Sequence, residues 1–423
     1  MELTDLTDTN PTRHGLFDPT VLEVVARQLP RAGRYEPSPR GPWPARAGLA
    51  ERYGGSPDDY WLTASTSEAY GWLFCLLADP GEAVAIPSPG YPLIEPLARF
   101  HGLATRSYRT FYVHPAGWEL DRDHLDSVLS DRDVRAVVAV NPNNPTGGYA
   151  DAAVRGQAAE RGLPLIADEV FFPFQLDHPS GGQSGTVADV LSSEPSTATA
   201  YCPRTETLVS PIERFESVGT VPADSFESVG TVPADSPADS HAVSALVRLS
   251  GDDSTLTFGL DGLSKLLAAP QLKLGWIRLS GPEPYKDRTA QALDQIADAH
   301  LSVNTPVALA LPELLTLADD SITRITNRLR ANLALARTIF TNLRIRTTHG
   351  GWMMLLDVPP IMEADALVVS LMDRAGLYVH PGYFYDLPDS TLAISLLPDS
   401  GVFEESARRL SAALTVFANE EPA

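Results

Sequence analysis

Lysine is rare in this sequence, which narrows the search for a reactive amine. The 423 residues include three lysines, Lys265, Lys273 and Lys286. Lys265 follows a predicted strand in FGLDGLSKLL, the position at which α/β folds display reactive groups. A lysine there can form a Schiff base with an aldehyde cofactor if its surroundings lower its pKa. The competing interpretation is an ordinary lysine at the start of a helix.

Two polar side chains follow other predicted strands. Asp168 ends the apolar strand PLIA, and a carboxylate at such a strand end can keep a pyridinium nitrogen protonated. It could equally cap a helix or bind a metal ion. Asn144 lies in NPNNPTGG at 141–148, where turn chemistry explains the prolines and glycines but not the asparagine. Its amide could hydrogen-bond a phenolic oxygen.

A run of hydroxyl residues indicates an anion site. Ser65, Thr66 and Ser67 precede a predicted helix, and the free N–H groups of a helix N-terminus bind phosphate. An ordinary helix N-cap is the alternative. Lys273 would add positive charge near such a phosphate. Tyr91, in PSPGYP, offers a flat aromatic face, or it simply packs in the core.

The elements that position these residues alternate between helix and strand from residue 60 onward. A capped helix is predicted in STSEAYGWLFCLLADPG, and another helix at 120–129. Short apolar strands are predicted in AVAIPSPGYP, RAVVAV, PLIADEVFF, TLTFGL and LKLGWIRL. This alternation predicts a parallel α/β sheet.

The C-terminal third has a different pattern. Apolar residues recur at helical spacing from Ile322 to Phe340, which predicts a long amphipathic helix that begins near Ser321. Strands are predicted in WMMLLDV and TLAISLL, and a final helix at 410–417. These elements indicate a smaller α+β domain.

Residues 177–254 interrupt the alternation. They are rich in Ser, Pro, Asp and Gly, and they contain FESVGTVPADS twice in tandem, at 215–225 and 226–236. A loop of this length far exceeds the ~12–15 residues usual in a compact domain. We expect a mostly disordered surface insertion. An ordered lid over an active site is the alternative.

Composition narrows the class of partner. The chain has 54 acidic and 32 basic residues and a formal charge of -22, which disfavours binding to nucleic acid or anionic membranes. Two cysteines are too few for a disulfide framework. The N-terminal residues lack the pattern of a secretory signal, and no apolar run approaches the ~20 residues of a membrane span. We expect a soluble cytoplasmic protein without a metal centre.

The order of the motifs resembles that of fold-type-I pyridoxal-phosphate enzymes of the class I/II aminotransferase family. The resemblance extends to Tyr35 in YEPSPRG, to GGW at 350–352 and to HPGYFY at 380–385. It implies a large domain with a mostly parallel seven-stranded sheet and a smaller α+β domain built from both termini. The implied boundaries are 1–45 for the N-terminal arm and part of the small domain, 46–280 for the large cofactor-binding domain, and 281–423 for the small C-terminal domain.

The resemblance also implies a cofactor, pyridoxal 5′-phosphate, and a role for each motif residue. By similarity, Lys265 carries the Schiff base and then shuttles a proton, while Asp168 keeps the ring nitrogen protonated. Asn144 would bind the phenolic oxygen, and Tyr91 would stack on the ring. Tyr35 looks like the tyrosine that reaches the phosphate of a neighbouring subunit, which implies a homodimer. The phosphate would be held by Ser65, Thr66, Ser67 and Lys273.

Several positions depart from the family pattern. Phe171 stands where a tyrosine usually gives the phenolic oxygen a second hydrogen bond, and Gly262 stands where a phosphate-binding serine is common. At Lys273 arginine is commoner, and the bidentate grip of arginine on phosphate is lost.

Ala393, in LAIS, is the departure that affects the substrate. The family usually has an arginine there that binds the substrate carboxylate. Either another arginine takes its place, for example Arg13 or Arg40, or the substrate lacks an ordinary α-carboxylate. The implied activity is transfer of an amino group between an amino acid or amine and a 2-oxo acid. A pyridoxal-phosphate-dependent lyase or decarboxylase, or a catalytically impaired relative, is the alternative, because the cofactor residues are shared.

Overall fold

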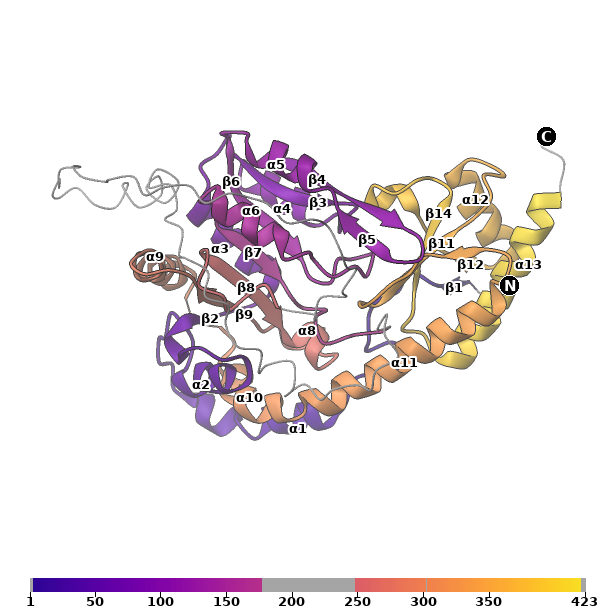
Figure 1. Cartoon of the computed structure of the whole chain (residues 1–423). Helices are drawn as coiled ribbons and strands as arrows, with labels where there is room; N and C mark the ends of the chain where they lie inside the picture. The colour runs from indigo at the N-terminus through magenta and orange to yellow at the C-terminus, as the bar shows by residue number, and fades with distance from the viewer. Residues whose placement is uncertain (1–2, 177–247, 302, 420–423) are drawn as a thin grey trace.

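The structure is a computed structural model that describes residues 3–176, 248–301 and 303–419. Within these residues, a large sheet surrounded by helices adjoins a smaller unit that holds both β1 and α13 (Figure 1). The predicted tandem repeat at 215–225 and 226–236 lies outside the described residues. No helix among the described residues is long and apolar enough to cross a membrane.

The large sheet has eight strands in the order β2-β9-β8-β7-β6-β3-β4-β5. Neighbours from β8 to β4 are parallel, β9 is antiparallel to both of its neighbours, and β5 is antiparallel to β4. The resemblance implied seven strands. The eighth is β5, which pairs with the end of β4 that extends beyond β3. The bounds are β2 (Tyr60–Thr63), β3 (Ala83–Ser88), β4 (Ala104–Val113), β5 (Gly117–Leu120), β6 (Val134–Val140), β7 (Leu165–Asp168), β8 (Thr257–Gly262) and β9 (Gly275–Ser280).

Helices cover both faces of this sheet. On one face α3 (Thr66–Leu77), α4 (Ile94–Phe100) and α9 (Tyr285–His300) contribute apolar side chains to one core cluster. On the other face α5 (Arg122–Leu129) and α6 (Ala153–Glu160) contribute to a second. A domain boundary at residue 280 would separate α9 from the face that it covers. We therefore propose that the large unit extends through His300.

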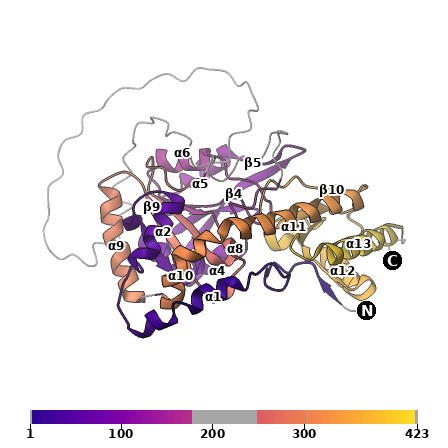
Figure 2. The same ribbon diagram turned by 90° about the horizontal axis from the view of Figure 1, so that it is seen from below.

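The smaller unit is built from both ends of the described chain. Its four-stranded sheet has the order β10-β11-β14-β13, and β1 pairs in parallel with β12. Arg409 of α13 reaches the Thr4 hydroxyl of β1 at 3.4 Å, and the two elements lie side by side in Figures 1 and 2. The strand bounds are β1 (Thr4–Asp5), β10 (Arg344–Ile345), β11 (Met353–Asp357), β12 (Leu377–Tyr378), β13 (His380–Pro381) and β14 (Thr391–Ser395).

A long helix joins the two units. Helix α11 (Ala318–Ile339) runs from beneath the large sheet to α13 (Ser400–Asn419) (Figure 2). It is the predicted long helix, and it begins three residues earlier than the predicted start at Ser321. Helix α10 packs against α1 and α2 on the same side. The remaining bounds are α1 (Thr20–Ala26), α2 (Trp43–Tyr53), α8 (Leu263–Leu266), α10 (Thr305–Thr316) and α12 (Ala364–Ser370).

The C-terminal end of the expected insertion is folded. Of the segment 177–254, residues 177–247 lie outside the described residues, but residues 248–254 are described. Leu249 is 2% exposed and belongs to the core cluster of α5 and α6. The prediction is therefore wrong for 248–254, because their partners lie far away in the sequence and composition does not reveal them.

Candidate active site

Lys265 lies on α8, the short helix that follows β8 directly. Its nitrogen Nζ is 4.8 Å from the ring centroid of Trp352 and 5.4 Å from that of Phe171. Burial lowers the pKa of Lys265 to about 8, although the nearby charge of Asp168 opposes this change. The amine is therefore available as a nucleophile at mildly basic pH.

Asp168 ends β7, close to helix α3. The Tyr70 hydroxyl donates to its Oδ2 at 3.1 Å, and the Val170 N–H donates to its Oδ1 at 3.3 Å. Burial raises the pKa of Asp168 to about 6, while these two hydrogen bonds and the charge of Lys265 act to lower it. The carboxylate is thus mostly charged at neutral pH and able to hold a cationic ring nitrogen.

Tyr70 is a site residue that the sequence did not reveal. It is 3% exposed and lies among apolar positions of α3, so its pattern is that of a core residue. Burial and the adjacent Asp168 raise the pKa of its hydroxyl well above the ordinary value, so it remains a hydrogen-bond donor. The one signal in the sequence that could have identified Tyr70 is its place near the N-terminus of a helix, the end that faces the strand ends.

The turn that holds Asn144 begins beside Asp168. The Asn141 N–H donates to the Asp168 carbonyl oxygen at 2.8 Å, and the Asn143 side chain donates to the Pro89 carbonyl oxygen at 3.2 Å. Asn144, just after these anchors, is half-buried and has no hydrogen-bond partner among the residues that the structure describes. Its amide therefore remains available to a ligand at the edge where the parallel strands end.

Tyr91 lies on the PSPGYP loop that the turn contacts. It is 44% exposed, which excludes simple core packing. Partial burial and the charge of Asp168 raise the pKa of its hydroxyl. The loop is fixed to the smaller unit by the Gly90 N–H, which donates to the Tyr385 carbonyl oxygen at 3.3 Å.

The N-terminus of α3 carries the hydroxyl residues predicted to bind an anion. Ser65 is its N-cap and accepts the Glu68 N–H at 3.1 Å. The N–H groups of Thr66 and Ser67 belong to the first turn, which has no partners within the helix. β9 begins against them at Gly275, where a Cβ atom would lie 3.2 Å from the Thr66 nitrogen. A side chain at position 275 would therefore crowd the N–H groups of this helix end, and glycine avoids that.

The other two lysines lie on separate elements. Lys273 is exposed, takes a left-handed φ of 53° and lies two residues before β9, the strand that contacts α3. Lys286, on α9, forms an ion pair with Asp59 at 2.7 Å. Lys273 is therefore the lysine whose place along the chain suits the predicted anion site.

Two departures from the family pattern have a local explanation. Phe171 packs edge-on against Trp352 at a centroid distance of 5.4 Å, and both rings contact the Lys265 amine. At Gly262 a Cβ would lie 3.0 Å from the Leu274 carbonyl oxygen and 3.1 Å from the Gly275 Cα. The close approach of β8 and β9 thus favours glycine at 262, and a serine hydroxyl is lost.

Ala393 lies in an apolar cluster. It is fully buried on β14, where it pairs with Leu355 and His380 of the neighbouring strands. The pKa of His380 is lowered by burial, and its Nδ1 forms a hydrogen bond with the Tyr385 hydroxyl at 2.8 Å, so it offers little positive charge. The apolar side chains packed with Ala393 are Met353, Leu355, Tyr385, Leu387 and Trp118.

The two arginines suggested as replacements are differently placed. Arg40 forms a bidentate pair with Asp294 at 2.5 and 2.6 Å and stacks over Trp61 at 4.5 Å. Its guanidinium is therefore held by Asp294 and Trp61 within the fold, which disfavours it as the carboxylate ligand. Arg13 is an exposed residue that pairs with Asp8 at 3.3 Å. Tyr35 is 65% exposed and is a surface residue within a single chain.

Comparisons with known proteins point to the family that the order of the motifs resembles. The family model "Aminotransferase class I and II" matches residues 36–200. Nicotianamine aminotransferase 1 of Oryza sativa is 36% identical over 120 residues, which cover 27% of this chain and 24% of that protein. Alanine aminotransferase of Mycobacterium tuberculosis is 32% identical over 314 residues, 71% of this chain and 57% of the relative. The chain thus spans well under two thirds of the length of these curated relatives.

The solved structures agree at the level of the fold. Alanine aminotransferase from Pyrococcus furiosus superposes with a TM-score of 0.74 at 19% identity, over 98% of this chain and 93% of that one. An α/β protein with a mostly parallel central sheet and this order of motifs has the type I fold of pyridoxal-phosphate enzymes. The chain belongs to the class I and II aminotransferase family.

Proposed function

We propose that this chain is a pyridoxal-phosphate-dependent aminotransferase that moves an amino group between an amino acid or amine and a 2-oxo acid. The observation that carries the proposal is the placement of two half-buried groups just beyond adjacent parallel strands: the Lys265 amine, with a pKa lowered to about 8, on the helix after β8, and the Asp168 carboxylate at the end of β7. Family membership and the relatives' names support the reaction type.

The residues present fit pyridoxal 5′-phosphate as a set of donors and acceptors. The N-terminus of α3 at Ser65, Thr66 and Ser67, with Lys273 nearby, suits the phosphate. Asp168 suits the ring nitrogen, Asn144 the phenolic oxygen and Tyr91 the ring face. When bound, the cofactor supplies an aldehyde for an amine and a protonated ring that withdraws electrons from the substrate Cα.

The protein's own groups then do three things. Lys265 Nζ would hold the cofactor covalently and would then take a proton from the substrate Cα and deliver it to the cofactor carbon C4′. Asp168, supported by Tyr70, stays charged and keeps the ring nitrogen protonated. The rings of Phe171 and Trp352 lie beside Nζ, and burial of the amine lowers its pKa and so favours its neutral form.

The apolar cluster around Ala393 limits which amino donors this chain can bind by an ion pair at that position. Ala393, Met353 and Leu355 offer no ion pair to a carboxylate. This cluster supports an amine, or an amino acid whose carboxylate is bound elsewhere. Arg13 remains open for the second case.

A homodimer is part of the proposal. Tyr35 is exposed on its own chain, and an exposed tyrosine on the N-terminal arm suits contact with a phosphate bound by a second copy. The cytoplasmic location expected from the sequence remains a prediction.

Spectroscopy of the purified protein tests the proposal. We expect a yellow protein, and Lys265→Ala should lose the absorbance of covalently held cofactor. A colourless wild type that takes up no added pyridoxal phosphate would refute the proposal. Products separate the chemistries: amino transfer yields a new amino acid from the 2-oxo acid, whereas elimination releases ammonia and decarboxylation releases carbon dioxide.

A further inference from the structure

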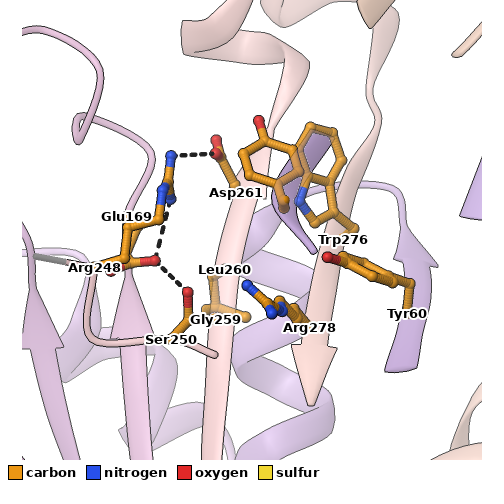
Figure 3. A pocket seen from close by; sticks show the side chains of 10 residues that line it. Tyr60, Glu169, Arg248, Ser250, Gly259, Leu260, Asp261, Trp276 and Arg278 are labelled. Atoms are coloured by element: carbon orange, nitrogen blue, oxygen red, sulfur yellow. Dashed lines mark hydrogen bonds and ion pairs between the residues drawn. The ribbon is translucent and has the colours of Figure 1, made fainter. Parts of the chain in front are cut away.

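We propose that Glu169 is a positioning residue, which holds Asp168 and the Asn144 turn in place through a buried charge cluster with Arg248. The proposal rests on the proposed function for the identity of the ligand. It concerns the face of the sheet opposite Tyr70, where Figure 3 shows Arg248 between Glu169 and Asp261.

Glu169 collects hydrogen bonds from a distant segment. Its side chain is 1% exposed. Its oxygens accept the Leu249 N–H at 2.7 Å, the Ser250 hydroxyl at 2.5 Å and an Arg248 guanidinium N–H at 3.1 Å. All three donors come from the residues at which the described chain resumes. The residue next to Asp168 thus anchors the return of the chain to the sheet.

The same carboxylate reaches the turn that carries Asn144. The Asn141 side-chain Nδ2 donates to Glu169 Oε1 at 3.4 Å, and the Oδ1 of the same side chain accepts the Ala150 N–H at 3.1 Å. Asn141 and Ala150 lie on either side of the turn. Glu169 is therefore linked, through one side chain, to both ends of the loop that presents Asn144.

Arg248 supplies the positive charge that faces the buried carboxylates of Glu169 and Asp261. Asp261, at the end of β8, is 4% exposed, and its Oδ2 lies 3.9 Å from the Arg248 guanidinium. Burial would lower the pKa of Arg248, but the charges of Glu169 and Asp261 raise it. Two buried carboxylates, one directly after β7 and one near the end of β8, thus share one guanidinium, and removal of Arg248 would leave both without a counter-charge.

The consequence for the site follows from the backbone. Glu169 directly follows Asp168, the last residue of β7, and successive side chains along an extended chain point to opposite sides, so fixing one side chain constrains the direction of the other. The Glu169 N–H also donates to the Leu260 carbonyl oxygen at 2.9 Å, which keeps β7 in register with the strand that leads to Lys265. The predicted phosphate site on α3 has no part in this cluster.

Separate binding measurements with two probes test the proposal. The full chain, stripped of cofactor, is titrated with pyridoxal 5′-phosphate and, separately, with inorganic phosphate. We expect Glu169→Gln and Asn141→Ala to weaken pyridoxal phosphate binding by about 10- to 100-fold, as loss of residues that support a ligand-binding group does at metal sites. Binding of inorganic phosphate should not change. Glu169→Ala should cost more than Glu169→Gln, which keeps an acceptor for the Leu249 N–H.

Asp294→Asn is the matched control, because it breaks the Arg40 ion pair outside this cluster. It should lower the melting temperature and leave both affinities unchanged. Unchanged affinity for pyridoxal phosphate in Glu169→Gln and Asn141→Ala, or an equal loss for both probes, would overturn the positioning role. If Glu169→Gln does not fold, Asn141→Ala alone decides, since it leaves the ion pairs intact. A wild type that binds phosphate but not pyridoxal phosphate overturns the proposed function and the role of Glu169 with it.

Discussion

Tyr70→Phe isolates the hydrogen bond that supports Asp168. The Tyr70 hydroxyl donates to Oδ2 at 3.1 Å from a residue that is 3% exposed, so water cannot replace it readily. A hydrogen bond to a charged group contributes about 1.5–3 kcal/mol, and about 1.4 kcal/mol corresponds to one pH unit. The Val170 N–H and Lys265 remain, so we take the lower end. The titration of Asp168 should then move from about 6 up by about one pH unit.

Carboxyl carbon NMR of the cofactor-free protein measures this directly, with Asp168→Asn to assign the resonance. The pKa of Asp168 is raised above its unfolded value, so stability falls as the pH rises from the unfolded pKa to the folded one and is level above it. In Tyr70→Phe that fall should continue to a higher pH. Tyr108→Phe is the control, because Tyr108 is equally buried but donates to the Val138 carbonyl oxygen at 2.9 Å. An unchanged or lower titration midpoint in Tyr70→Phe would refute the reasoning.

Three further predictions concern other parts of the site. The rate at which cofactor-free protein captures pyridoxal phosphate should rise with pH and level off above about 8, because the neutral Lys265 amine reacts; a flat profile from pH 6 to 9 would contradict this. Gly275→Ala should weaken binding of inorganic phosphate measured by calorimetry, since its Cβ would lie 3.2 Å from the Thr66 nitrogen, whereas Gly156→Ala, with nothing within 4 Å, should not. Ala393→Arg should destabilise the fold strongly, because it adds volume and an unpaired charge at a fully buried position in an apolar cluster. It should also raise turnover of α-amino acids relative to simple amines, and an unchanged ratio would mean that this cluster does not face the donor.

Local pattern was enough to predict most elements of the large unit. The hydroxyl run before an apolar helix gave the N-cap at Ser65, and the short apolar runs gave β3, β6, β7, β8 and β9, since buried parallel strands carry continuous apolar residues. Strands β4 and β5 were not predicted, because β4 alternates partly exposed polar and aromatic residues.

Contacts between residues far apart in the chain could not be predicted from the sequence. Glu169 and Arg248 are 79 positions apart, and Arg40 and Asp294 are 254 apart, so no spacing rule connects them. Composition placed 248–254 in the insertion for the same reason. The motif residues Lys265 and Asp168 could be found because each follows a strand. Tyr70 could not, because a buried phenol on a helix has the pattern of ordinary core packing.

The ion pair between Lys286 and Asp59 has a practical consequence for chemical labelling. Of the three lysine amines in the chain, this one is held by a carboxylate at 2.7 Å, and the other two are the candidates for the Schiff base and the phosphate. Isotope-labelled reductive methylation therefore produces very few signals, and two of them would report on ligand binding. The same scarcity means that amine coupling to a sensor surface would consume the groups under study, so immobilisation should use a different chemistry.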